Sequence, residues 1–183
     1  FKDFSAKRSL HVANEGVEVD GENHRIAGLN KKFPNLVLVP VSIYTIEGIV
    51  ISKKVHFKVD GWESIRPYII GLRRGIIFAE NGTTGMTRSI VYSNEHLFNM
   101  LNSNRFDIIL LTRINASKYL NQVENGDLIV LEPPIETHKM YHYLHKKNAH
   151  LIPKLSKVLF EMQEEGLLKQ HKDAFMEQLS SKP

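Results

Sequence analysis

The sequence has no cysteine and no long apolar run. Across 183 residues, the lack of cysteine excludes a thiol nucleophile, a disulfide framework and any cysteine-ligated zinc or iron–sulfur site. This composition fits an oxidising compartment, where stray thiols are a liability, although cytosolic chains can also lack cysteine. The clean apolar runs, such as residues 108–111, are far shorter than the roughly 18 residues that cross a membrane.

The amino end lacks two further features, an initiator Met at position 1 and an apolar signal segment. We therefore expect a chain that is processed or truncated at its amino end. The remaining composition is ordinary for a globular protein, with 42% hydrophobic and 24% charged residues, so a disordered or fibrous chain is not expected.

The net charge is +4, from 24 basic and 20 acidic residues. Basic pairs stand at residues 31–32, 53–54, 73–74 and 146–147, spread along the chain and mixed with acids. A surface that binds a phosphate backbone is usually denser in basic residues and more one-sided. The pattern predicts a solvated surface and no nucleic-acid partner.

Apolar runs alternate with amphipathic stretches along the chain. We expect strands at residues 36–39, 46–51, 69–72, 89–92, 106–111, 128–131 and 137–145. We expect helices at residues 6–14, from a cap at Ser93 to about 103, at 115–123, and a short one at 76–80. Several strands are continuous apolar runs, which suit a parallel sheet that is covered on both faces. Strands and helices that alternate at this spacing predict an α/β fold.

The carboxyl end carries only helical patterns. Pro153 fits the first turn of one helix, Gly166 can end it, and a second helix follows. The sharpest break before this region is residues 132–134 (EPP), where we expect the chain to change direction after a strand that ends at Leu131.

Two patterns invite metal or nucleotide binding. His138, His142 and His145 are close in sequence, but on a strand His138 and His142 lie two pleats apart and His145 points to the other face. No carboxylate completes a ligand set at helical spacing, so we predict no metal. Residues 82–85 (GTTG) lack the Lys that a phosphate loop needs, so we expect no nucleotide or other cofactor. These glycines better suit the end of a short helix and the turn into the next strand.

Arg73, Arg74 and Gly75 form the most suggestive pattern. They follow a predicted strand and precede a predicted helix, and in open α/β sheets ligands sit beyond the carboxyl ends of strands. A Gly at a helix start lets backbone N–H groups approach an anion, and an adjacent Arg can clamp a carboxylate. The alternative is a solvated Arg pair beside a helix cap. Trp62 and Tyr68 flank a turn nearby and are either packing residues or aromatics at the edge of a ligand site.

Catalysis has little support in the sequence. The nucleophile motif Gly-x-Ser-x-Gly is absent, and acid pairs such as residues 164–165 lie on a predicted exposed helix face. Glu80, one turn into the helix after Gly75, is the one carboxylate that could serve a catalytic site. We therefore expect a protein that is not an enzyme.

Taken in order, five segments resemble a known family: residues 61–65 (GWESI), 70–75 (IGLRRG), 96–107 (HLFNMLNSNRFD), 143–147 (YLHKK) and 160–166 (FEMQEEG). They are similar to the periplasmic solute-binding proteins with two α/β lobes and two crossover strands, and most similar to extracellular family 3, the amino-acid-binding group. The resemblance covers about residues 4–179. Nothing matches the family's opening strand, helix and second strand. The family's ligand-clamping Arg of the first lobe and its late Asp have no clear match, although Arg25 lies near the region expected for the Arg.

The resemblance implies two lobes, each a mainly parallel sheet flanked by helices, with the first lobe incomplete. Lobe one would comprise residues 1–50 and, on the return of the chain, 141–183 with two closing helices, and lobe two residues 51–140. A small polar or anionic, amino-acid-like metabolite would bind in a cleft between the lobes, which would close about a hinge at residues 46–52 and 136–141. Arg73, Arg74, Gly75, Trp62, Tyr68 and Arg25 would line the site.

The resemblance also implies a periplasmic location and a membrane permease or a sensor as partner. Three functions remain open: a binding protein for transport or sensing, an enzyme on the same fold, or a partner-dependent fragment. A lobe that lacks its opening strands would expose a sheet edge, which could pair with another chain in self-association.

Overall fold

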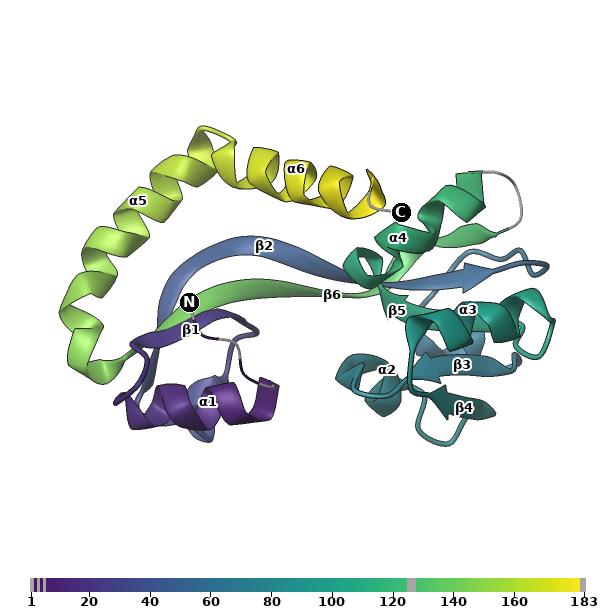
Figure 1. Cartoon of the computed structure of the whole chain (residues 1–183), viewed down its shortest axis with the longest axis horizontal. Helices are drawn as coiled ribbons and strands as arrows, with labels where there is room; N and C mark the ends of the chain where they lie inside the picture. The colour runs from purple at the N-terminus through teal and green to yellow at the C-terminus, as the bar shows by residue number, and fades with distance from the viewer. Residues whose placement is uncertain (1, 3, 5, 125–127, 182–183) are drawn as a thin grey trace. The chain divides into compact units, whose positions relative to one another are not determined.

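The computed structural model describes residues 2, 4, 6–124 and 128–181 (Figure 1). The chain divides into two compact units. Unit 1 comprises Phe1–Thr45 and His138–Ala174, and unit 2 comprises Ile46–Thr137 and Phe175–Pro183. The chain first passes between the units on the long strands β2 (Leu36–Ser52) and β6 (Ile129–His145), where the expected boundaries at 50 and 140 also lie. It passes between them a third time within the last helix, α6 (Leu167–Ser181), whereas the expected division keeps 141–183 together.

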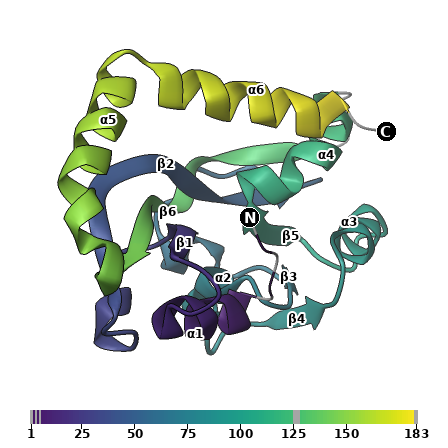
Figure 2. The ribbon, with the colours of Figure 1, turned by 60° about the vertical axis from the view of Figure 1, so that its left-hand side comes forward.

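Unit 1 is built on the antiparallel pairing of β1 and β6. Its elements are α1 (Ala6–Glu15), β1 (Gly21–Arg25), η1 (Leu29–Lys31), the start of β2 (Leu36–Ser52), the end of β6 (Ile129–His145), η3 (Lys146–Leu151), α5 (Ile152–Glu164) and most of α6 (Leu167–Ser181). Gly21 pairs with Leu144 and Glu22 with Tyr143. In Figure 2, α1 lies beside β1. Ala13, Leu36 and Tyr143 form the small buried core.

Unit 2 holds the parallel part of the sheet. Its elements are the end of β2, η2 (Trp62–Ile65), β3 (Ile70–Arg73), α2 (Ile77–Gly82), β4 (Arg88–Val91), α3 (Asn94–Asn102), β5 (Ile108–Thr112), α4 (Arg113–Glu124) and the start of β6. β3 lies between β5 and β4 and is parallel to both, whereas β2 joins β5 antiparallel. The six strands follow the order β1-β6-β2-β5-β3-β4.

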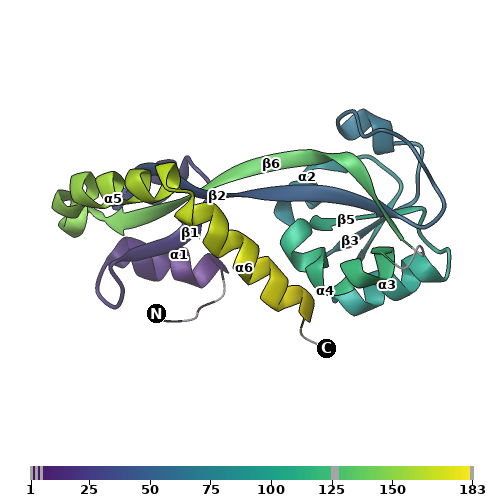
Figure 3. The ribbon, with the colours of Figure 1, turned by 90° about the horizontal axis from the view of Figure 1, so that it is seen from above.

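Alternate residues of the same strands bury opposite faces of the unit 2 sheet. Ile109 and Leu111 of β5 pack in one cluster with Leu97, Phe98 and Leu101 of α3 and Ala116 of α4. Ile108 and Leu110 pack in a second cluster with Ala79 of α2 and Ile65 of η2. Figure 3 shows α3 and α4 on the same side of β3 and β5. This two-sided burial explains why the strands are continuous apolar runs.

The sequence-based assignments of unit 2 are confirmed to within two residues for β3, β4, β5 and α4. Ser93 caps α3 as predicted, because its hydroxyl oxygen accepts the N–H of His96 at 3.1 Å. Gly82 ends α2, and Gly166, with φ +75°, separates α5 from α6.

Two predictions about the strands are wrong. The strand after residue 128 does not end at Leu131 but continues as β6 through residues 132–134 to His145. Proline has no N–H to donate, and it is accommodated in a strand where no such hydrogen bond is needed. The segment still pairs through its carbonyls, because the carbonyl of Glu132 accepts the N–H of Val59 at 3.1 Å. The separate strands expected at 36–39 and 46–51 are likewise one strand, β2. A mainly parallel sheet is present in unit 2, and the described register of unit 1 is antiparallel. Among the described residues, no helix has the length and apolar character needed to cross a membrane.

Candidate functional site

Three parallel strands of unit 2 end at one edge of the sheet. Arg73, the last residue of β3, pairs with Val91, the last residue of β4, and β5 runs alongside in the same direction. The residues that leave this edge are Arg74 after β3, Tyr92 after β4 and Arg113 after β5. We call it the carboxyl edge of unit 2. In open α/β sheets this edge is where ligands bind.

The arginine pair stands at the centre of the carboxyl edge. The Arg73 side chain is partly buried, and its Nε is buried without a hydrogen-bond partner among the described residues. Arg74 is exposed. Its backbone N–H donates to the carbonyl of Val91 at 2.8 Å, and its guanidinium carbon lies 5.2 Å from the centre of the Tyr92 ring. That ring, 79% exposed, can hold the Arg74 side chain by a cation–π contact. The strand pairing therefore holds the backbone of both arginines at the end of β3.

Gly75 forms the turn, but its amide is already occupied. The residue has φ +88°, a conformation that favours glycine. Its N–H donates to Glu80 Oε1 at 2.6 Å, so the chain's own carboxylate satisfies the group that the sequence offered to a ligand anion. An anion could reach this amide only by displacing Glu80. The same bond engages Glu80, which was the one carboxylate considered for catalysis.

Trp62 and Tyr68 lie in the apolar layer of unit 2. The Trp62 ring centre lies 6.3 Å from that of Phe78, and the ring also covers Gly82 so closely that an added Cβ would lie 2.3 Å from it. Tyr68 stacks on Phe57 with ring centres 4.8 Å apart. Tyr68 precedes the start of β3, whereas Arg74 follows its end.

Both rings pack against the second core cluster. The structure thus brings Arg73, Arg74 and Gly75 together in one turn. It places Tyr68 toward the opposite end of β3, and it packs the Trp62 ring against Gly82, the last residue of α2. Burial of these two rings stabilises the α2 side of the sheet. A contact between these two rings and a ligand stays a prediction.

Arg25 belongs to unit 1 and already has a carboxylate partner. Its Nη2 lies 2.9 Å from Glu22 Oε2 on the same strand, and the Glu22 side chain is 5% exposed. Burial raises the pKa of nearby Tyr44, and the positive charge of Arg25 partly offsets that effect. A role of Arg25 in ligand binding stays a prediction.

Arg113 was missed by sequence reasoning. Its Nη2 donates to Glu132 Oε1 at 2.8 Å, and its Nε donates to Glu47 Oε2. Burial alone would lower the pKa of Arg113, but the hydrogen bonds to Glu132 and Glu47 outweigh it and raise the pKa above its usual value. The sequence did hold one sign of its importance: Arg113 comes just after a predicted strand, as Arg74 does. Its partners lie 19 and 66 residues away in sequence.

Two histidines of β6 contact backbone atoms. His142 Nδ1 lies against the carbonyl of Asn23, and His145 Nδ1 accepts the N–H of Lys147 at 3.2 Å. Within residues 2, 4, 6–124 and 128–181, no group of three or more His, Asp or Glu side chains could hold a metal ion.

No family model and no curated protein matches the sequence. Solved structures do match. The GluR0 ligand-binding core in complex with L-glutamate has a TM-score of 0.73 at 10% identity, with 99% of this chain and 80% of that chain covered. The probable amino-acid ABC transporter extracellular-binding protein ytmK from Bacillus subtilis has a TM-score of 0.72 at 18% identity, with 96% and 79% covered. A histidine kinase sensor domain with similarity to periplasmic binding proteins has a TM-score of 0.63 at 13% identity, with 93% and 75% covered. The chain therefore has the α/β, two-lobed fold of the periplasmic solute-binding proteins.

Proposed function

We propose that this protein is a solute-binding protein that captures a small polar or anionic, amino-acid-like metabolite for transport or sensing, without catalysis. The single observation that carries this proposal is the pair Arg73 and Arg74 at the carboxyl edge of unit 2. Neither guanidinium forms an ion pair with a described acidic side chain. Guanidinium groups at this edge that lack a carboxylate partner suit an anionic group on a ligand.

The chemistry of the turn favours binding over catalysis. The Glu80 carboxylate, which would have to act as acid or base, accepts the N–H of Gly75 and stabilises the turn instead. The Arg74 side chain rests on the exposed Tyr92 ring, which limits the entropy that the guanidinium loses when a ligand binds. A carboxylate-bearing metabolite is the ligand class that such a clamp recognises best.

The cellular context follows from the same reading. The similar structures include an amino-acid ABC transporter extracellular-binding protein and a histidine kinase sensor domain. For this chain we infer a periplasmic location and a membrane permease or sensor as partner. We also infer that self-association could occur along β1, which is the outermost strand on the unit 1 side of the strand order.

The test is isothermal titration with L-glutamate, L-glutamine and L-arginine, the amino acids of the similar structures' complexes. We expect one of them to bind the wild type. Arg74→Gln should weaken that binding about 10- to 100-fold, because a lost charge-assisted hydrogen bond costs about 1.5–3 kcal/mol.

The matched control is Arg105→Gln. Arg105 is exposed and comes just before β5, at the amino edge of the same sheet, so its loss should change the affinity less than twofold. Thermal melting of each variant checks folding. If no member of the panel binds the folded wild type, or if both variants lose affinity equally, the arginine pair is not the site.

A further inference from the structure

The segment of unit 2 that joins β2 to η2 carries a row of exposed charged and polar side chains. It comprises residues 53–60 and begins with one of the basic pairs of the sequence. Burial alternates along it, because the side chains at positions 55, 57 and 59 are partly or fully buried. An extended chain with one face on a core produces this alternation. The side chains of the other face are all exposed, and we call them the charged row: Lys54, His56, Lys58 and Asp60.

The inner face of the segment is fixed to unit 2. Phe57 packs against the second core cluster, and Val59, which is 2% exposed, belongs to it. The N–H of Val59 donates to the carbonyl of Glu132 at 3.1 Å. At the start of the segment, the N–H of Lys54 donates to the hydroxyl oxygen of Ser52 at 3.2 Å. The backbone under the charged row is therefore held in place, so a partner that binds there has little backbone to order.

The charges of the row are unpaired within the described part of the chain. Neither Lys54 nor Lys58 forms an ion pair with a described acidic side chain, and Asp60 forms none with a described basic one. His56 Nδ1 lies 3.2 Å from the carbonyl of Lys54. Side chains two residues apart on an extended chain are about 6.7 Å apart, so the two lysines are about 13 Å apart with the imidazole between them.

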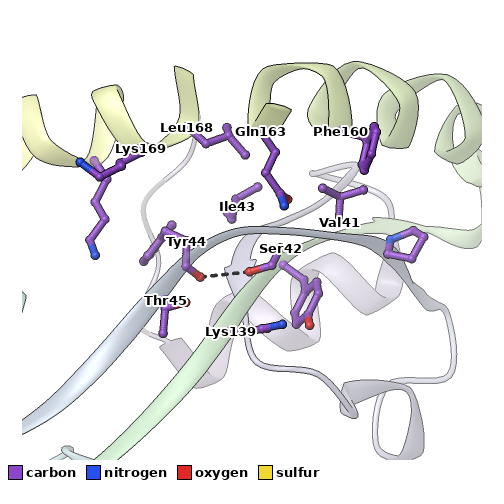
Figure 4. Close-up of a pocket in the computed structure, with 13 residues that line it drawn as sticks. Val41, Ser42, Ile43, Tyr44, Thr45, Lys139, Phe160, Gln163, Leu168 and Lys169 are labelled. Atoms are coloured by element: carbon purple, nitrogen blue, oxygen red, sulfur yellow. Dashed lines mark hydrogen bonds between the residues drawn. The ribbon is translucent and has the colours of Figure 1, made fainter. Parts of the chain in front are cut away.

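The lysines around the gap in unit 1 are arranged differently. Figure 4 shows Lys139 and Lys169 on opposite sides of β2. The Nζ of Lys169 also lies 2.7 Å from Asp173 Oδ2. These two charges therefore do not face a common partner, whereas those of the charged row do.

We propose that the charged row docks an extended acidic segment of a partner protein, with carboxylates at alternate positions beside Lys54 and Lys58. Alternate side chains of an extended partner repeat at the spacing of the row, so its carboxylates can meet both lysines at once. An anionic membrane fits less well, because Asp60 would be repelled by its headgroups and the row has no apolar side chain to insert. The docking surface does not depend on the amino-acid site at the carboxyl edge.

The test uses two end-capped hexapeptides of equal composition and charge. One alternates Glu and Thr, and the other has three Glu followed by three Thr. Each is titrated into the ¹⁵N-labelled full chain and followed by amide NMR shifts, which suit weak binding. We expect the alternating peptide to shift residues 53–59 and to bind about threefold more tightly than the other. Raising the ionic strength should weaken it, because salt screens exposed charges.

The paired variants are Lys54→Gln and Lys58→Gln. Each should weaken the alternating peptide about two- to fivefold, and the double variant about tenfold, since exposed charge pairs are modest. Asp60→Asn should strengthen it. Lys154→Gln removes an exposed lysine of α5 in unit 1 and is the matched control for net charge. Arg74→Gln should leave the peptide unaffected, which separates this proposal from the amino-acid site, and thermal melting checks the folding of each variant.

Four results would overturn the proposal. The alternating peptide could fail to shift the folded wild type at millimolar concentration. The two peptides could bind equally well, which would remove the role of the spacing. Lys154→Gln could weaken binding as much as Lys54→Gln, which would leave only net charge. Phosphatidylglycerol vesicles could sediment the chain through Lys54 and Lys58 while the peptide does not bind, in which case the row faces a membrane.

Discussion

Arg113 joins two strands that are far apart in sequence, and its removal should destabilise unit 2 specifically. The guanidinium stands at the first residue of α4, with Glu47 of β2 on its Nε and Glu132 of β6 on its Nη2. Replacement by Met keeps the length of the side chain and removes the charge. Both carboxylates then lose their cationic partner, so we expect Arg113→Met to lower the free energy of unfolding by about 2–3 kcal/mol.

The two partners should contribute unequally. The Arg113 side chain is 30% exposed, that of Glu47 28% and that of Glu132 55%. A hydrogen bond to a charged group contributes about 1.5–3 kcal/mol, whereas an exposed ion pair contributes about 0–1 kcal/mol. Screening by water therefore leaves a coupling energy of about 1–2 kcal/mol for Arg113 with Glu47 and less than about 1 kcal/mol for Arg113 with Glu132.

Double-mutant cycles measure both couplings. One cycle combines Arg113→Met with Glu47→Gln and the other combines it with Glu132→Gln. Urea unfolding is followed by tryptophan fluorescence, because the chain's one tryptophan, Trp62, lies in unit 2 and reports on that unit. Arg105→Gln serves as the control for loss of an exposed guanidinium. Equal coupling energies, or no coupling to Glu47, would refute the reasoning from burial.

Two further predictions concern the cores. Gly71→Ala would place a Cβ 2.3 Å from the ring of Phe106, which is 4% exposed and cannot move aside, so urea unfolding should show a loss of about 1–3 kcal/mol that Phe106→Leu partly restores. Burial raises the pKa of Tyr143 above its usual value of about 10, so the folded state holds that proton more tightly and stability should be full below about pH 10 and fall above it. In thermal melts from pH 8 to 11, Tyr143→Phe should make the loss of stability with rising pH less steep. An unchanged dependence of stability on pH would contradict the role of Tyr143.

Much of the fold was predictable because its signals are local. The continuous apolar runs of β3 and β5 and the polar cap at Ser93 are readable from neighbouring residues, and the structure has them. The path of β6 was not predictable in this way. Prolines usually end a strand, and only the partner segment at Val59, which donates to the carbonyl of Glu132, shows that this one continues.

The candidate site was half predictable. The turn of Arg73, Arg74 and Gly75 follows from a strand that is followed by a helix, a pattern that the sequence displays directly. The placement of the Trp62 and Tyr68 rings depends on which helix covers which face of the sheet. The occupation of the Gly75 amide depends on a side-chain rotamer of Glu80, and no residue pattern specifies it.

The class of elements, the lack of thiol chemistry and the arginine turn can all be read from the amino-acid sequence, because each depends on residue type and on short-range periodicity. Which charges are neutralised and which lack a partner depends on the fold. Arg113 and Arg74 occupy equivalent positions after parallel strands, yet Arg113 meets Glu47 and Glu132, whereas Arg74 meets the Tyr92 ring. A charged side chain pairs with the residues of the neighbouring strand in the sheet, and the order of the strands is not a local property of the chain.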